Sequence, residues 1–300
     1  MRTSFINQLL DEAEKNKKIF LIVGDLGYHV VEPFAKKYPE RFLNIGIAEQ
    51  NMAGVAAGLS MIGYNVYIYS IGNFPTLRCL EQIRNDIAYH NANVKIVSVG
   101  AGYAYGSLGA THQATEDIGA IRVIPNMVVA TPGDPIEAKS IAHLSADFNG
   151  PMYIRLGKAG EKIVHREQNL SLQLGDISTI LFSENNKMAV LACGSILDKA
   201  HQQIIDNKLE YNLYSIPFVK PINKSQLIGI VKLHSEGIIT LEEHQKSCGM
   251  GSAIVELVND LYYCGEISIY PKIKRISIPD YFADVVGTQD FLRRYERLSI

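Results

Sequence analysis

Glu49 is the only charged residue between Asn44 and Leu59, a stretch otherwise made of apolar, small and neutral residues. It lies where an apolar run typical of a buried strand (41–47) passes into a helical pattern (49–63) that is closed by glycine. Ligands of open α/β sheets bind at this end of a strand, so a carboxylate here could exchange a proton with a ligand. The helix dipole alone also favours an acid at this point, and position by itself favours that second explanation.

His112 is a second candidate, in the glycine-rich segment 100–117 that reads GAGYAYGSLGATHQATED. The glycine spacing lacks the helix and the acidic residue that accompany a dinucleotide-binding loop, so it does not predict one. A loop that follows a strand can still line a site, and we expect His112 to face it. Lys158, in the turn 156–160, has two interpretations: a solvated side chain or a contact to phosphate.

The segment 241–252, LEEHQKSCGMGS, gathers two acids, a histidine and glycines after another apolar run. We interpret it as a capped loop that positions the following helix. Cys248 has only His244 nearby as a base, which is too little to predict a nucleophile. Hydrolase motifs such as G-x-S-x-G and H-E-x-x-H do not occur in the sequence.

Short apolar runs alternate with helical patterns, which predicts parallel β-α-β units with helices on both faces of a sheet. The alternation weakens over the polar stretch 158–178 and then restarts. We therefore expect two consecutive three-layer α/β domains, at 1–165 and 186–300, joined by a linker at 166–185. The predicted strands cover 18–25, 41–47, 64–70, 93–100, 127–134, 186–195, 211–219, 236–244 and 272–280. The predicted helices cover 49–63, 75–90, 134–148, 198–208, 223–234 and 251–263, after an amphipathic N-terminal helix.

The composition excludes several classes of protein. The chain has 300 residues, 47% hydrophobic and 20% charged, which is enough for a sizeable core. A net charge of −2 without a Lys/Arg-rich run argues against nucleic-acid binding. We also expect no membrane association and a cytoplasmic location, since no signal peptide or bilayer-length apolar run is present. The four cysteines suit a reducing compartment, because they form neither zinc pairs nor a disulfide framework.

An ordered series of motifs resembles the transketolase family over essentially the whole chain. The motifs are GDL (24–26), RFLNIGIAEQNMAGVAAGL (41–59), FPTLRCLEQIRNDIAYHNANVKI (74–96), ATHQATEDIGAIRVIPNMVVATPGDPIEA (110–138) and PMYIRLGK (151–158). Farther on, ITLEEH and GMGSAIVEL resemble the family's C-terminal domain. The resemblance implies a thiamine-pyrimidine-binding domain with a mostly parallel sheet, followed by a transketolase C-terminal-like domain.

The resemblance covers only part of a full-length transketolase. Those chains begin with a domain whose G-D-G motif helps hold Mg²⁺ and the diphosphate of thiamine diphosphate, and this sequence has no G-D-G. The resemblance therefore implies the C-terminal (small) subunit of a split transketolase, with a transketolase N-terminal subunit as its partner and no metal ligand of its own. The small residues at 53–58 suit a tight contact between protomers, so we expect a homodimer and, with the partner, an α₂β₂ assembly.

The resemblance also assigns cofactor-binding residues. Glu49 matches the catalytic glutamate that exchanges a proton with N1′ of the cofactor's aminopyrimidine ring. Phe74 matches an aromatic residue that packs on that ring, although Ile71 and Leu77 stand where the family usually has further aromatics. Asp25, in the first motif of the series, is expected at the same cofactor site.

The residues matched to the substrate side depart from the family pattern. His112 matches a catalytic histidine that contacts the substrate, and Lys158 stands where an arginine commonly binds phosphate. Leu108 replaces an aspartate that contacts a sugar hydroxyl, and leucine cannot accept a hydrogen bond. Gly100 stands where a histidine usually helps hold phosphate. We therefore expect ketol transfer on a specialised or modified sugar, with His112, Lys158 and Leu108 lining the substrate site.

Three alternatives stay open. The β subunit of a 2-oxoacid dehydrogenase has the same domain order, but that group usually has H-S-Q in place of T-H-Q. An enzyme resembling deoxyxylulose phosphate synthase normally keeps D-G before T-H-Q. A non-catalytic interaction subunit would retain the fold, but it would have no reason to keep both Glu49 and His112.

Overall fold

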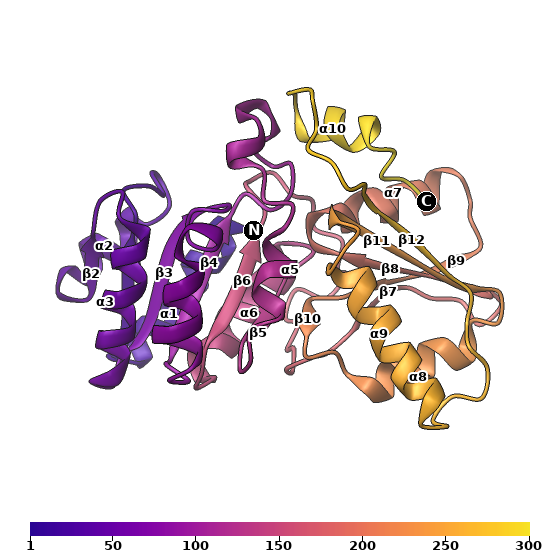
Figure 1. Ribbon diagram of the computed structural model, residues 1–300, viewed down its shortest axis with the longest axis horizontal. Helices are drawn as coiled ribbons and strands as arrows, with labels where there is room; N and C mark the ends of the chain where they lie inside the picture. Colours follow the sequence, from indigo (N-terminus) through magenta and orange to yellow (C-terminus); the bar gives the residue numbers. More distant parts are fainter.

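The computed structural model describes residues 1–300 as two β-sheets with helices packed on their faces (Figure 1). The strands are β1 (Ile19–Val23), β2 (Phe42–Asn44), β3 (Asn65–Ile71), β4 (Val94–Val99), β5 (Val128–Ala130), β6 (Met152–Leu156), β7 (Ser178–Leu181), β8 (Met188–Cys193), β9 (Tyr211–Ser215), β10 (Phe218–Lys220), β11 (Gly237–Gln245) and β12 (Ile273–Ile278). The main helices are α1 (Arg2–Lys15), α2 (Glu32–Lys37), α3 (Glu49–Met61), α5 (Asp117–Arg122), α6 (Pro135–Asp147), α7 (Leu197–Asp206), α8 (Lys224–Leu233), α9 (Met250–Tyr263) and α10 (Gln289–Tyr295). None of the helices is long and apolar enough to cross a membrane.

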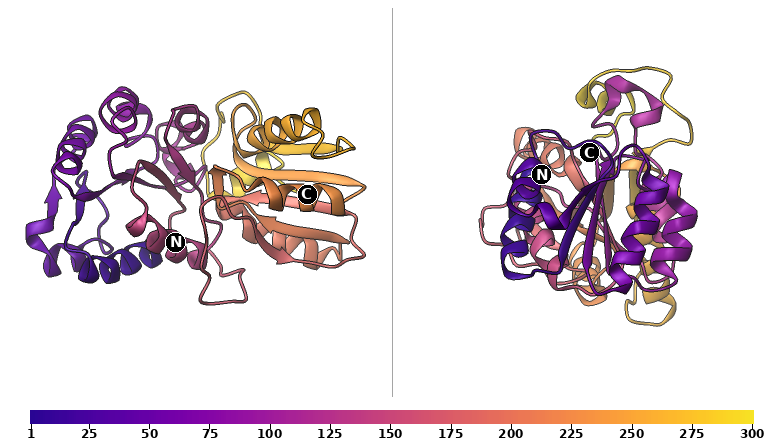
Figure 2. Two further views of the ribbon diagram at one scale, coloured as in Figure 1. Left: turned by 90° about the horizontal axis from the view of Figure 1, so that it is seen from below. Right: turned by 90° about the vertical axis from the view of Figure 1, so that its left-hand side faces the viewer.

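The two sheets are mostly parallel. The first runs in the order β10-β5-β6-β4-β3-β1-β2 and the second in the order β12-β11-β8-β9-β7. The antiparallel pairs are the edge pairs β10 with β5 and β7 with β9. Two consecutive α/β domains with mostly parallel sheets confirm the predicted fold class. Figure 2 shows them side by side in one view and the first sheet between its helix layers in the other.

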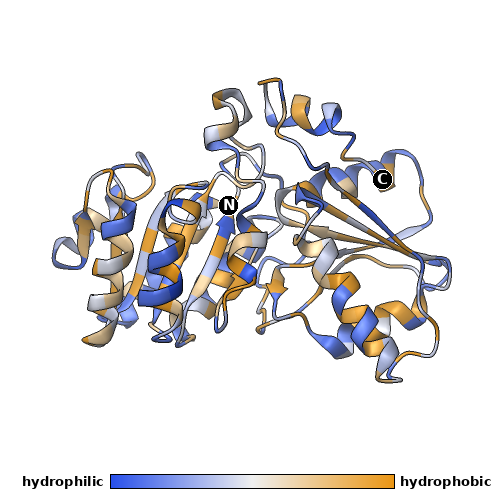
Figure 3. Cartoon of the chain, in the orientation of Figure 1, coloured by the Kyte–Doolittle hydropathy of each residue, from blue (hydrophilic) through white to orange (hydrophobic).

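Helices bury both faces of the first sheet. On one face α1 and α6 pack together around an apolar cluster that includes Phe5, Leu9 and Ile141. On the other face α3 and the segment 77–88 contribute Met52 and Ile87 to a second cluster. Strands β4, β5 and β6 are buried along their whole length, as expected where both faces are covered. Figure 3 shows these apolar strands behind helices with hydrophilic outer surfaces.

The second sheet is covered in the same way. Alternate residues of its strands point to opposite faces, so Leu191 packs with α8 and α9 while Val190 packs with α7 and α10. The cluster that contains Leu191 also contains Met52 of α3. The two sheets therefore share one continuous apolar core, which holds the domains together.

One predicted strand, 211–219, is split between the two sheets. β9 stays in the second sheet, whereas β10 crosses to the first sheet and pairs antiparallel with β5. Pro217 stands between them and has no N–H to donate to a continuing ladder. The segment predicted as a linker, 166–185, contains β7, which pairs with β9. Helices α2 and α10 and strand β6 have no counterpart among the predicted elements.

Two further elements near the future site differ from prediction. The expected helix 75–90 is a succession of a 3₁₀ turn η2 (Leu77–Cys79), one α-helical turn α4 (Leu80–Gln82) and a π-helical stretch η3 (Ile83–Ala88). The expected strand 41–47 ends at Asn44, because Gly46 adopts a φ of +76°. The Asn44 Oδ1 atom accepts a hydrogen bond from Gly46 N at 3.0 Å and so stabilises the turn that leads into α3.

A buried group of two carboxylates and a histidine joins α6 to the segment after β6. His165 Nδ1 lies 3.0 Å from Asp134 Oδ2, and its Nε2 lies 3.4 Å from Glu137 Oε1. The Asp134 side chain also caps α6, since its Oδ1 accepts a hydrogen bond from Ile136 N. Burial lowers the pKa of His165, but the hydrogen bond to Asp134 and the charge of Glu137 outweigh it, so the pKa is raised.

We expect this group to favour the folded state at mildly acidic rather than alkaline pH. A histidine whose pKa is raised by folding contributes fully below its unfolded pKa of 6.5, and the contribution is lost as the pH rises through the folded pKa. The thermal midpoint of the wild type should therefore fall by a few degrees from about pH 6 to about pH 9, and that of His165→Gln should fall less. His90→Gln, at an exposed site, is the control. An equal fall in wild type and His165→Gln would contradict the prediction.

Candidate active site

The loops that follow β1, β3, β4 and β6 lie at one edge of the first sheet, at the top of Figure 1. Parallel strands place their carboxyl ends at the same edge, which is where open α/β sheets bind ligands. All six residues predicted for the site lie at this edge. Asp25 follows β1, Glu49 begins α3 after β2, Phe74 follows β3, Leu108 and His112 follow β4, and Lys158 follows β6.

Glu49 is buried at the start of α3, with a side chain only 1% exposed. Its Oε1 accepts a hydrogen bond from Ser70 Oγ at 3.0 Å, and its Oε2 accepts one from Arg78 Nη1 at 2.7 Å. A Cβ added to Gly24 would lie 3.4 Å from Oε1, so the turn after β1 passes close to the carboxylate. The helix dipole explains an acid at this position, but it does not explain a carboxylate turned inward between two strands.

Phe74 and His112 come from different loops and meet edge to face. Their ring centroids are 5.2 Å apart and the ring planes are inclined by 70°. The guanidinium carbon of Arg78 lies over the Phe74 ring, 4.4 Å from its centroid. A continuous series of contacts therefore runs from the Glu49 carboxylate through Arg78 and Phe74 to His112.

Two features fix the loop after β3 against the loop that carries His112. Asn73 Nδ2 donates a hydrogen bond to Gln113 O at 2.7 Å. Gly72 adopts a φ of +49°, and a Cβ there would lie 3.3 Å from His112 O. Both the conformation and the space at this position favour glycine. The relative placement of Phe74 and His112 thus depends on backbone contacts as well as on their rings.

Arg78 is a site residue that the sequence reasoning did not identify. Its side chain is 43% exposed, so the cation lies toward solvent and the carboxylate of Glu49 lies behind it. A signal was present in the sequence, because Arg78 interrupts the run Leu77, Cys79, Leu80 just as Glu49 interrupts its own apolar stretch. What the sequence alone could not show is that these two interruptions pair with each other.

The residues expected on the substrate side surround the long loop after β4. Leu108 is 55% exposed, in the short helical turn Gly106–Leu108. Lys158 is also exposed, and its Nζ lies 4.9 Å from the centroid of the Tyr105 ring. Gly100 has a φ of +101°, and a Cβ there would collide with the Tyr105 ring. The loop as folded therefore leaves no room for a histidine at position 100.

Asp25 contributes to the shape of the site rather than to its interior. It is exposed, with a φ of +54°, and its Oδ1 accepts a hydrogen bond from Asn44 Nδ2 at 3.0 Å. Its backbone N–H donates to Asn44 Oδ1 at 3.1 Å. These bonds tie the turn after β1 to the turn that leads into Glu49.

The acids of the segment 241–252 join elements together, in agreement with its interpretation as a capped loop. Both carboxylate oxygens of Glu242 accept backbone hydrogen bonds at the start of α9, from Met250 N at 2.6 Å and Gly251 N at 2.9 Å. Burial raises the pKa of Glu242 to about 7. His244 Nε2 accepts from Gly119 N at 3.2 Å, and burial lowers the pKa of this imidazole to about 4. His244 is therefore neutral and links the second domain to α5.

Comparison with known proteins identifies the family. Residues 1–160 match the family described as transketolase, pyrimidine binding domain, and residues 179–291 match transketolase, C-terminal domain. The chain belongs to the transketolase family. The predicted resemblance is thereby confirmed, and members of this family generally use thiamine diphosphate.

Several transketolase relatives are themselves subunits or sections. A putative transketolase C-terminal section of Methanocaldococcus jannaschii is 32% identical, with 98% of this chain and 91% of the relative covered. One of the subunits of the apulose-4-phosphate transketolase of Phocaeicola vulgatus is 32% identical over 86% of this chain and 83% of its own length. A 6-deoxy-6-sulfo-D-fructose transketolase subunit of a Clostridium species is 28% identical over 98% and 88%.

Solved transketolase structures have the same fold. A split-gene transketolase described as an inactive β4 tetramer superposes with a TM-score of 0.85 at 30% identity, covering 99% of this chain and 93% of that one. Transketolase from Leishmania mexicana superposes with a TM-score of 0.75 at 16% identity, and this chain covers 43% of it. The second likeness concerns the fold alone.

Proposed function

We propose that this chain is the small subunit of a split transketolase-like enzyme, a transferase that moves a two-carbon ketol unit between sugars. In this proposal residues 1–165 form the pyrimidine-binding domain, 166–185 a linker and 186–300 the C-terminal domain. The observation that carries the proposal is the buried carboxylate of Glu49, beside Phe74 and His112 at the carboxyl edge of the first sheet.

The residues present fit the aminopyrimidine end of thiamine diphosphate. When bound, this cofactor supplies the carbon nucleophile that attacks a ketose. Glu49 holds a proton at the ring nitrogen N1′ and takes it back, which a buried carboxylate on a rigid helix start can do. Phe74 offers an apolar ring surface for packing, and Asp25 holds the adjoining turn in place through Asn44. His112 lies beside Phe74 and donates a hydrogen bond to substrate oxygen.

The diphosphate end of the cofactor belongs, in this proposal, to a transketolase N-terminal subunit that also holds Mg²⁺. Relatives named as a C-terminal section and as one of several transketolase subunits support such a division. No three or more His, Cys, Asp or Glu side chains of this chain are grouped to hold a metal ion. The related β4 tetramer, described as inactive, supports self-association of the lone subunit. We propose a homodimer that joins its partner as α₂β₂ in the cytoplasm.

The substrate in this proposal is a specialised sugar phosphate. Leu108 offers an apolar, exposed side chain near the site entrance, and Lys158 offers a point charge for phosphate. Relatives named for apulose-4-phosphate and for 6-deoxy-6-sulfo-D-fructose support a donor other than the common phosphosugars.

A donor screen on the reconstituted pair tests this function. The two subunits, thiamine diphosphate and Mg²⁺ are mixed with one ketose donor at a time, and release of the shortened aldose is measured. We expect kcat/KM at least about tenfold higher for a modified donor than for xylulose 5-phosphate, since one missing hydroxyl contact changes discrimination by that order. Omitting either subunit should remove activity. Full turnover of xylulose 5-phosphate with ribose 5-phosphate would contradict the substrate assignment, and activity without the cofactor would contradict the function.

A further inference from the structure

We propose that Arg78 is a latch that closes the aminopyrimidine site of this chain and must release Glu49 before the cofactor binds. The inference rests on the proposed function, because it concerns the same carboxylate. It adds a residue that works against binding, so that the isolated subunit keeps its site shut.

Arg78 covers both groups that the aminopyrimidine requires. Its Nη1 donates to Glu49 Oε2 at 2.7 Å, while Ser70 Oγ already donates to Oε1 at 3.0 Å, so both carboxylate oxygens have donors. Its guanidinium carbon lies 4.4 Å from the centroid of the Phe74 ring, the distance at which a stacked ring would lie. The planar guanidinium thus occupies the place between carboxylate and aromatic ring that an aminopyrimidine would fill.

The free energy of the closed state comes from the burial of Glu49. A carboxylate that is 1% exposed loses nearly all its hydration, and a paired cation offsets that loss. The Arg78 side chain is 43% exposed, so its guanidinium can turn into water without disturbing the core. The carboxylate cannot follow it, since Glu49 begins α3 and Ser70 lies on β3. The mobile member of the pair is therefore the arginine.

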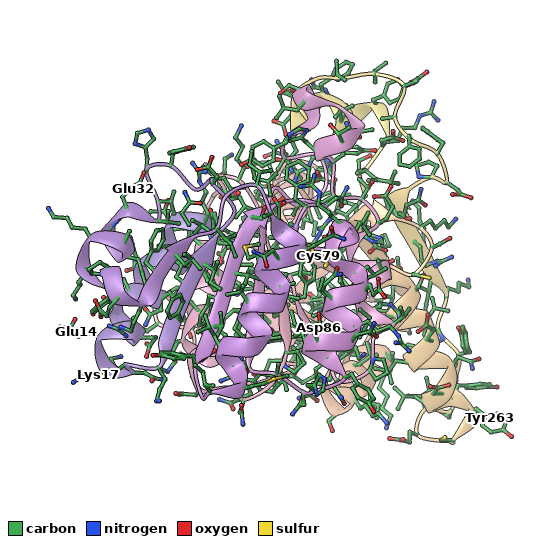
Figure 4. The ribbon with its side chains drawn as sticks, turned by 60° about the vertical axis from the view of Figure 1, so that its left-hand side comes forward. Glu14, Lys17, Glu32, Cys79, Asp86 and Tyr263 are labelled. Carbon is green, nitrogen blue, oxygen red and sulfur yellow. The ribbon has the colours of Figure 1, made fainter.

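The backbone around Arg78 also suits a side chain with two positions. Arg78 lies in the 3₁₀ turn η2, before the short α4 and the π-helical η3, and none of these is a regular α-helix of several turns. Figure 4 labels Cys79, next to Arg78, and Asp86 at the other end of this segment. Cys79 is buried and anchors the backbone, while Arg78 beside it is exposed. The side chain can move while the backbone stays in place.

A latch lowers the apparent affinity for the cofactor by the fraction of open sites. Arg78→Gln removes the ion pair, keeps a polar side chain and should leave the site open. We expect its dissociation constant for thiamine diphosphate, measured by titration calorimetry on the reconstituted pair with Mg²⁺ and no sugar, to be roughly threefold to tenfold lower than that of wild type. Arg84→Gln is the matched control, because Arg84 is exposed on the same segment and donates to its neighbour Asn85.

A double-mutant cycle on the isolated subunit tests the ion pair without any cofactor. Arg78→Gln should lower the thermal midpoint by about 2 to 4 °C, because it leaves a buried carboxylate without its cation. Glu49→Gln combined with Arg78→Gln should restore most of the loss. A cycle with no coupling would overturn the latch, since the pair would then not exist in solution.

The outcomes separate the latch from the proposed function. Unchanged or weaker binding by Arg78→Gln, where the wild-type pair binds the cofactor, would overturn the latch and leave the function intact. Weaker binding in particular would place Arg78 in the bound state as a support for Glu49. A wild-type pair that binds no thiamine diphosphate at all would overturn the proposed function, and the latch with it.

Discussion

Glu49→Gln is expected to lower the turnover of the reconstituted enzyme by about 10³-fold, within the range for loss of a positioned acid–base group. The glutamine amide has nearly the same shape and can still accept a hydrogen bond from Ser70, but it cannot exchange a proton. The loss should appear in kcat more than in KM for the sugar, since Glu49 acts on the cofactor rather than on the substrate. Pre-steady-state and steady-state rates with the best donor measure it.

The control for this variant is Gln50→Ala, one residue along α3 at an exposed position. It should leave turnover within about twofold of wild type, as expected for a surface change away from the site. Circular dichroism and the thermal midpoint must show that Glu49→Gln is folded. A folded Glu49→Gln enzyme with more than a tenth of wild-type turnover would remove Glu49 from the proposed mechanism.

Arg155→Met is expected to lower the free energy of unfolding by about 3 to 5 kcal/mol, the cost of breaking a buried ion pair by removing one partner. The Arg155 side chain is 2% exposed and that of Asp117 is 0% exposed, with Arg155 Nε 2.7 Å from Asp117 Oδ2. Burial raises the pKa of Asp117, but the charge and hydrogen bond of Arg155 outweigh it and hold that pKa below its usual value. Without Arg155 the carboxylate stays buried with no cation.

Arg155 also joins three parts of the molecule. Its Nη2 donates to Ala114 O at 2.6 Å, just after the His112 loop, and to Glu243 O at 3.0 Å in β11 of the second domain. Tyr153 on the same strand donates its hydroxyl to Asp117 at 2.5 Å. Loss of Arg155 should therefore loosen the His112 loop and the contact between domains together, and activity should fall with stability.

Urea unfolding followed by circular dichroism measures the effect of Arg155→Met. The double variant Arg155→Met with Asp117→Leu should regain most of the lost stability, because apolar replacements of both charges leave none uncompensated. Arg84→Met, at an exposed position, should stay within about 0.5 kcal/mol of wild type. A loss below about 1 kcal/mol for Arg155→Met would show that this pair does not hold the domains together, since that is the range of exposed ion pairs.

The sequence by itself determined the fold class and the chemical types at the site. Alternating apolar runs and helical patterns are local signals, so they predicted two α/β domains and placed Glu49, Phe74, His112 and Lys158 after strands. An ordered series of motifs then gave the family. The glutamate stood out because a single charge in an apolar stretch is costly unless something in the structure uses it.

The tertiary structure alone decided which of these residues meet. Glu49 and Arg78 are 29 positions apart and pair, and Asp117 and Arg155 are 38 positions apart and pair, yet no periodicity links either couple. Strand β10 joins the first sheet because Pro217 ends the β9 ladder and β5 offers an open edge. Such contacts depend on long-range packing, which fixes positions only when both partners are in place. Local sequence predicts each partner's secondary structure and burial, whereas the fold as a whole selects the pairs.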